Sequence, residues 1–347
     1  MKTSVAVAVG EDVCPWDVAE DSEDDEDWLF SSISQYEQLH MFQLSVRAAQ
    51  MSLSPDGCHL ALAGSGRASL EVFRLPGKLV AASSEEEGLT SNRDFTLVCG
   101  SVESPAVSSL QYVGRRRLVT TTSDSRALSL WSWQAGEDLL QLSGEVDIGQ
   151  FQPRAVEVVG QEENLLVWGE NGLARTDLAG LVVDRREVGG EIQTVMTEGS
   201  VTWCLETRGD LSSVDWRQSN TVLHHNIHQT LSQSCFFQRG ASTFLAGQSE
   251  AALSVWDVRA SRPVEEVSLA RPGRPGGHIV ADREKIVVSE GPAVNIYSDD
   301  LRVVFSHEAH RAEICCLLTH PAVKNLVISA DTNNRLQAWV FNRKNLT

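Results

Sequence analysis

Three residues near the C-terminus have the types found in a catalytic triad. They are His310, Ser329 and Asp331, and Trp339 follows them. A histidine held by a carboxylate can take a proton from a serine hydroxyl, which activates the oxygen as a nucleophile. The same residues are also spaced like a hydrogen-bonded network that fastens one blade of a repeat propeller. The regular repeat described below favours the structural interpretation over catalysis.

A second cluster has the composition of a metal site. His224, His225 and His228 lie close to Cys235. Two histidines four residues apart bind zinc when a helix aligns them. This stretch has the pattern of a strand ending in a loop, and we expect no metal or other cofactor there. The motifs GxxxxGK[ST], GxSxG and HExxH are absent from the sequence, so we predict a protein without enzymatic activity.

The elements that carry these residues repeat along the chain. Strand-like segments recur with steps of 58, 46, 39, 40, 41 and 42 residues, anchored at Phe73, Trp131, Asp177, Trp216, Trp256, Tyr297 and Trp339. Such periods are typical of propeller blades with four strands each. The runs are short, alternate in polarity and end at Gly, Asp, Asn or Pro, which indicates strands. The sequence therefore predicts an all-β, seven-bladed β-propeller, with a repeat boundary between Val188 and Glu191.

The two ends of the chain differ from this repeat. Residues 1–26 are acidic and predict a disordered segment, and 27–39 predict a short amphipathic helix that begins at Asp27. The propeller is assigned to 40–347. The last repeat, His310–Phe341, supplies three strands, and His40–Val46 is a spare strand before the first repeat. We expect this strand to pair with the last blade, because that pairing leaves no free edge in the ring.

Charge and composition limit the possible partners. The 347 residues carry a net charge of −18, and 42% of them are apolar. Binding to nucleic acid or to an anionic membrane needs clustered Lys and Arg, so we expect neither. The seven cysteines are odd in number and form no CxxC. They predict reduced thiols in a cytosolic or nuclear protein, and we expect a monomer in isolation.

The acidic run Glu20–Asp27 meets an apolar segment, Trp28-Leu29-Phe30, without a linker. One interpretation is a solvated tail. The other is a docking segment, because an acidic run beside a bulky apolar anchor suits a basic groove that contains a hydrophobic pocket. The helix predicted after it has the same two interpretations, either packed under the propeller or facing a partner.

The chain resembles the WD repeat-containing protein 73 family over most of residues 26–341. The similarity is carried by EDWLFSSISQYEQLHMFQL (Glu26–Leu44), RDF (Arg93–Phe95), GDLSSVDWRQ (Gly209–Gln218), VFSHEAH (Val304–His310), HPAVKNLVISA (His320–Ala330) and LQAW (Leu336–Trp339). The resemblance implies a WD-repeat propeller in which His310, Ser329, Asp331 and Trp339 form the blade network.

The resemblance also implies a function. It points to a non-enzymatic factor that holds the Integrator RNA endonuclease heterodimer, subunits 9 and 11, in the cytoplasm with its active site occluded before nuclear import, together with a HEAT-repeat companion. The alternative that it implies is a scaffold at spindle poles and the cleavage furrow in mitosis, acting through adaptor proteins. The candidate partner-binding residues are Asp24, Asp25, Glu26, Asp27, Trp28, Leu29, Phe30 and Arg93.

Overall fold

The structure is a computed structural model. It describes residues 36–65, 69–80, 94–101, 106–149, 151–160, 164–179, 182–218, 221–269, 277–298, 300–308 and 310–341. Within these ranges the chain is almost entirely β, and every pair of neighbouring strands is antiparallel. One short helix, Gly77–Val80 (α2), follows the third strand of the first sheet. The predicted all-β architecture is confirmed, and several of the sheets are four-stranded and antiparallel.

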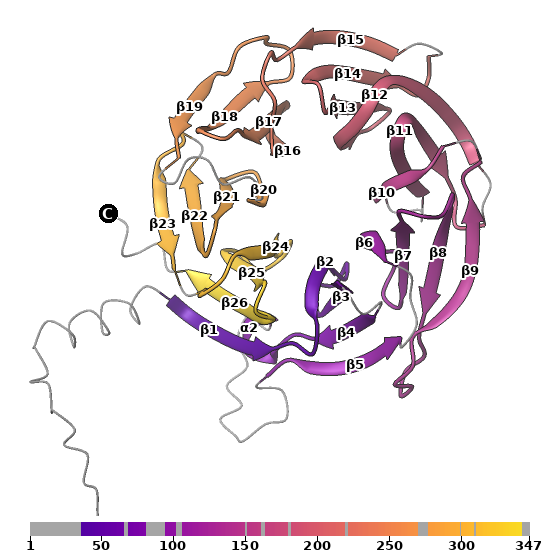
Figure 1. The fold of residues 1–347 in the computed structure, drawn as a ribbon, viewed down its shortest axis with the longest axis vertical. Coiled ribbons are helices and arrows are strands. Elements are labelled where there is room, and N and C mark those ends of the chain that lie inside the picture. The colour runs from indigo at the N-terminus through magenta and orange to yellow at the C-terminus, as the bar shows by residue number, and fades with distance from the viewer. Residues whose placement is uncertain are drawn as a thin grey trace, which may run out of the picture.

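The sheets are arranged in a ring, with the first strand of each nearest the centre (Figure 1). The first sheet contains Arg47–Leu53 (β2), His59–Ser65 (β3), Leu70–Arg74 (β4) and Thr96–Ser101 (β5). The second contains Val107–Tyr112 (β6), Arg117–Thr122 (β7), Ala127–Ser132 (β8) and Gln141–Asp147 (β9).

A six-stranded sheet follows. It contains Pro153–Val159 (β10), Asn164–Thr176 (β11), Val182–Glu198 (β12), Val201–Glu206 (β13), Asp210–Asp215 (β14) and Thr221–Asn226 (β15). The next four-stranded sheet contains Gln233–Arg239 (β16), Ser242–Gln248 (β17), Ala252–Asp257 (β18) and Glu265–Ser268 (β19). After it come Ile279–Ala281 (β20), Lys285–Glu290 (β21), Ala293–Ser298 (β22) and Val303–His307 (β23).

The long strand β12 runs across the repeat boundary that the sequence predicted between Val188 and Glu191. Its first half pairs with β11 and its second half, from Ile192, pairs with β13. Gly190 lies next to this change of partner, and a Cβ atom there would lie 2.5 Å from Glu206 Oε2. The glycine therefore lets the strand pass close to a buried carboxylate while it turns from one partner to the next.

The last sheet unites the two ends of the described chain. It contains Ile314–Thr319 (β24), Leu326–Asp331 (β25), Arg335–Phe341 (β26) and Tyr36–Gln43 (β1). The strand β1 pairs along β26, with Leu39 opposite Trp339 and Phe42 opposite Leu336. Figure 1 shows β1 on the outer side of this sheet.

The strand β1 corrects the predicted helix over 27–39 and the predicted bounds of the strand His40–Val46. Residues 36–39 are strand, and the strand ends at Gln43; residues 27–35 lie outside the described part of the chain. The reason is long-range: the backbone of β26 offers hydrogen bonds along its whole edge, which outweigh the local helical pattern. The Phe42 ring adds packing, with its centroid 5.6 Å from that of Phe73 and 5.7 Å from that of Phe95.

Apolar clusters fill the spaces between neighbouring sheets. Between the last and the first sheet, Leu60, Leu62 and Phe73 pack against Ile328 and Leu336. A second cluster joins the first sheet to the sheet of β6–β9. Another joins the sheet of β20–β23 to the last sheet. Each sheet buries both faces against its neighbours, so the ring is stabilised by contacts between sheets as well as within them.

Candidate functional site

The predicted partner-binding residues cannot be placed. Residues 24–30 and Arg93 all lie outside the described part of the chain. Their role stays a prediction from the sequence and the resemblance.

The predicted blade network is partly visible in hydrogen bonds. His310 Nδ1 lies 3.0 Å from Asp331 Oδ2, and His310 Nε2 lies 2.7 Å from Ser329 Oγ. Trp339 packs in the same region, with its ring centroid 4.5 Å from that of His307. These bonds have the connectivity of a catalytic triad, but the His310 and Asp331 side chains are 0% exposed. No substrate can reach them, so the arrangement fastens the segment before β24 to the end of β25.

Two further features of this network are structural. Burial lowers the pKa of His310, and the bond to Asp331 opposes that effect without cancelling it. The second oxygen of Asp331 accepts hydrogen bonds from the backbone N–H groups of Asn333 and Arg335, both at 2.9 Å. One carboxylate therefore holds both the buried histidine and the turn between β25 and β26.

The histidine cluster at 224–228 does not form a metal site in the described residues. His224 Nε2 lies 2.7 Å from Ser213 Oγ, and its ring centroid lies 4.8 Å from that of Trp203. No group of three His, Cys, Asp or Glu side chains among the described residues is arranged to hold a metal ion. Within the same residues, no helix is long and apolar enough to cross a membrane.

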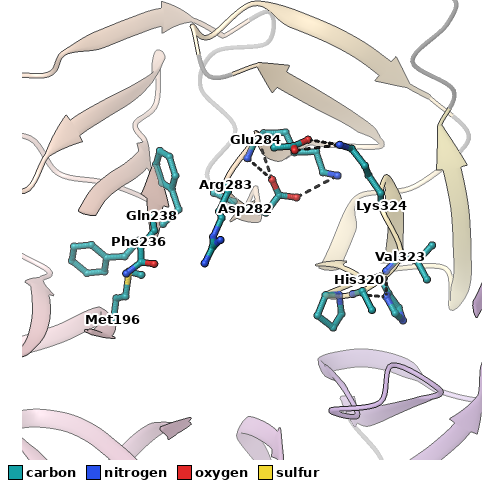
Figure 2. A pocket seen from close by; sticks show the side chains of 14 residues that line it. Met196, Phe236, Gln238, Asp282, Arg283, Glu284, His320, Val323 and Lys324 are labelled. Atoms are coloured by element: carbon teal, nitrogen blue, oxygen red, sulfur yellow. Dashed lines mark hydrogen bonds and ion pairs between the residues drawn. The ribbon is translucent and has the colours of Figure 1, made fainter. Parts of the chain in front are cut away.

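A hollow of about 640 Å³ opens near the centre of the ring, and no sequence motif predicted it. Its walls come from β12, from β16 and from the turns β20–β21 and β24–β25 (Figure 2). Both turns connect the innermost strand of a sheet to the next strand, so they lie at the same end of the ring. Met196, Phe236 and Val323 supply apolar surface, and Gln238 and Arg283 supply polar groups.

Among the described residues that line this hollow, the charged side chains are paired in all but one case. Lys285 Nζ lies 3.3 Å from Asp282 Oδ2, and Lys324 Nζ lies 2.9 Å from Glu284 Oε2. Arg283 is exposed, and Figure 2 shows its side chain reaching into the open space without a bond to the other residues drawn. The carboxylates of Asp282 and Glu284 pair with the two lysines, so they do not neutralise the charge of the Arg283 guanidinium.

His320 fixes one wall of the hollow. Its Nδ1 accepts hydrogen bonds from the backbone N–H groups of Ala322 and Val323, at 3.1 and 2.8 Å. The hydrogen of the neutral ring must therefore be on Nε2, which donates to the carbonyl oxygen of Gly57 at 3.0 Å. The β24–β25 turn is thereby attached to the first sheet and is held in one conformation.

Comparison with known proteins shows a similarity to an assembly factor over part of the chain. The sequence matches no protein-family model. Over 110 residues it is 27% identical to the Integrator complex assembly factor WDR73 of Danio rerio. The matched segment is 32% of this chain and 29% of that protein, so the chain spans less than a third of the relative's length. This supports a distant relationship to a WD-repeat protein.

Proposed function

We propose that this protein is a non-enzymatic assembly scaffold, built as a closed seven-bladed WD-repeat propeller. It binds the Integrator RNA endonuclease heterodimer, subunits 9 and 11, in the cytoplasm and occludes the active site before nuclear import, and a HEAT-repeat companion joins it. The observation that carries the proposal is the similarity of 110 residues to an Integrator complex assembly factor.

The described structure supports action through protein contacts. The histidine, serine and aspartate that could do chemistry are buried, and they fasten a blade. The ring is braced by apolar clusters between sheets, which suits a rigid docking platform. A net charge of −18 opposes direct binding of RNA. We therefore assign the function to its surfaces.

We further propose that the segment Asp24–Phe30 and Arg93 contact the endonuclease. A channel that accepts RNA presents clustered positive charge, and the run Glu20–Asp27 places seven carboxylates within eight residues. Charge of this kind accelerates association but holds weakly. Trp28, Leu29 and Phe30 would supply the apolar anchor that slows dissociation.

The test uses the full chain and the purified heterodimer. Binding is measured at several salt concentrations for the natural protein and for a variant in which Asp21, Glu23, Asp24, Asp25, Glu26 and Asp27 become Asn or Gln. We expect slower association, weaker affinity and a flatter salt dependence for the variant. As a control, Glu85, Glu86 and Glu87 become Gln, which removes acid from another segment and should leave binding unchanged.

Two outcomes would contradict the proposal. Unchanged affinity and salt dependence in the acidic-run variant would remove that segment from the interface. Affinity purification that retrieves tubulin-associated proteins but no endonuclease subunit would replace the assembly role with the mitotic scaffold.

A further inference from the structure

We propose that the hollow at the mouth of the ring, lined by Met196, Phe236, Gln238, Arg283 and Val323, binds an extended segment of a partner protein. The segment carries one acidic side chain next to an apolar one. Arg283 pairs with the carboxylate, and Phe236, Met196 and Val323 cover the apolar side chain. This inference concerns the ring itself and does not depend on which protein is the partner.

The carboxylate preference follows from the charges on the two turns. Lys285 and Lys324 are already neutralised by Asp282 and Glu284. Arg283 lies between Asp282 and Glu284 in sequence and extends into the hollow instead of toward either carboxylate (Figure 2). A guanidinium presents a planar fork of donors that matches the two oxygens of a carboxylate. The site therefore offers one strong, directional contact for a single acidic group.

The rest of the lining favours a peptide over a nucleic acid. Phe236, Met196 and Val323 are all half-buried, so their remaining exposed surface can be covered by a side chain of the partner. Gln238 offers an amide that can bond to a peptide backbone. A phosphate backbone needs several cations in a row, whereas the described residues of this site offer one unpaired cation, Arg283, with the carboxylates of Asp282 and Glu284 beside it. Mixed apolar and polar linings of this size are typical of ligand sites.

The two turns that form the site are held in place before a ligand arrives. Asp282 Oδ1 accepts hydrogen bonds from the backbone N–H groups of Glu284 and Lys285, at 2.8 and 3.0 Å. The opposite turn is held by His320 through Ala322, Val323 and Gly57. A site that is already ordered loses little entropy on binding, so even a short peptide should be detectable.

The experiment follows the methyl groups of methionine in the full-length protein by NMR. The chain has four methionines, Met1, Met41, Met51 and Met196. Met196 lines the hollow, whereas Met41 lies on the outer strand β1 and is 64% exposed. The probe is acetyl-Phe-Glu-Leu-Gly-amide, whose single charge is the glutamate carboxylate. We expect the Met196 signal to shift with peptide concentration and the Met41 signal to stay in place.

Variants and a second peptide test the role of the charge. Arg283→Gln should weaken the peptide's affinity at least tenfold, Arg283→Lys should weaken it less, and acetyl-Phe-Gln-Leu-Gly-amide should bind to the natural protein as weakly as the glutamate peptide binds to Arg283→Gln. The matched control is Arg311→Gln, which removes the same charge from an exposed arginine before β24, at the opposite end of that strand, and should not change affinity. Unchanged Met41 and Met51 signals verify that each variant is folded.

The proposal is overturned by any of three results. The first is a peptide that leaves Met196 unmoved at millimolar concentration. The second is equal binding of the glutamate and glutamine peptides, or equal binding to the natural protein and Arg283→Gln. The third is a hexauridylate RNA that shifts Met196 as strongly as the peptide, because the site would then be one for phosphate.

Discussion

The carboxyl group of Glu157 on β10 should make the stability of the fold depend on pH. Burial raises the pKa of this group from 4.5 to about 7. Its Oε2 atom is buried and has no hydrogen-bond partner among the described residues, although the residue as a whole is partly exposed. The folded chain therefore holds a proton that the unfolded chain releases at lower pH.

The sign follows from the direction of the shift. The pKa of Glu157 is higher in the folded protein than in the unfolded chain. Below about pH 4.5 the group is protonated in both states, so it does not lower the free energy of unfolding. As the pH rises from about 4.5 through 7, stability is lost. At about 1.4 kcal/mol for each tenfold change in proton affinity, the full loss at high pH is about 3 kcal/mol. The partial exposure of the residue makes this an upper value.

The perturbation is Glu157→Gln, which keeps the shape of the protonated acid and cannot ionise. We expect the variant to be more stable than the natural protein, with an advantage that grows by about 2 kcal/mol between pH 5.5 and pH 8. Urea unfolding at half-unit pH steps measures this difference. The control is Glu145→Gln on β9, an exposed position, where we expect a change below about 0.5 kcal/mol at every pH. A constant difference between Glu157→Gln and the natural protein across this range would refute the reasoning.

Three further substitutions test the fold by chemical denaturation. Phe42→Ala removes a ring that packs on two other phenylalanines, and it should lower the free energy of unfolding by about 2 to 4 kcal/mol. The control Met41→Ala, on the exposed face of the same strand, should cost less than about 0.5 kcal/mol. Similar costs for the two variants would argue against β1 as a packed strand. Gly57→Ala should cost about 1 to 3 kcal/mol, since Gly57 has a φ of 70° and a Cβ atom there would collide with the His320 ring; a neutral effect would contradict that contact. Asp331→Ala should cost about 3 to 5 kcal/mol, because it leaves a buried histidine and two backbone donors without their acceptor. A cost below about 1 kcal/mol would show that water replaces the carboxylate.

The strands could be predicted from the sequence where their signals are local. Phe73, Trp131 and Tyr297 each lie on the third strand of a four-stranded sheet, opposite an apolar residue of the second strand. Alternation and turn residues encode such strands within a few positions. The turn at Ser54–Gly57 is of this kind: Asp56 Oδ1 accepts hydrogen bonds from Ser54 Oγ and the backbone N–H of Cys58.

Two other features could not be predicted because they depend on distant parts of the chain. The helical pattern before His40 is overridden by the edge of β26, which lies about 300 residues further on. The hollow is assembled from positions near 196, 236, 283 and 320. Nothing local to Arg283 marks it as facing a shared space, since a charged residue in a turn usually faces solvent.

The pairing of β1 with β26 also sets the order in which the protein can fold during its synthesis. Among the described strands, β1 is synthesised first and ends at Gln43, but its partner begins at Arg335. At 5–20 residues per second, the intervening chain takes roughly 15 to 60 s to make. During that time Phe42 and the unpaired backbone of β1 have no native partner, and one face of the first sheet lacks the last sheet, which buries it in the folded protein. The last sheet can therefore form only after Phe341 has been synthesised, so the growing chain exposes an aggregation-prone strand while the residues between β1 and β26 are made.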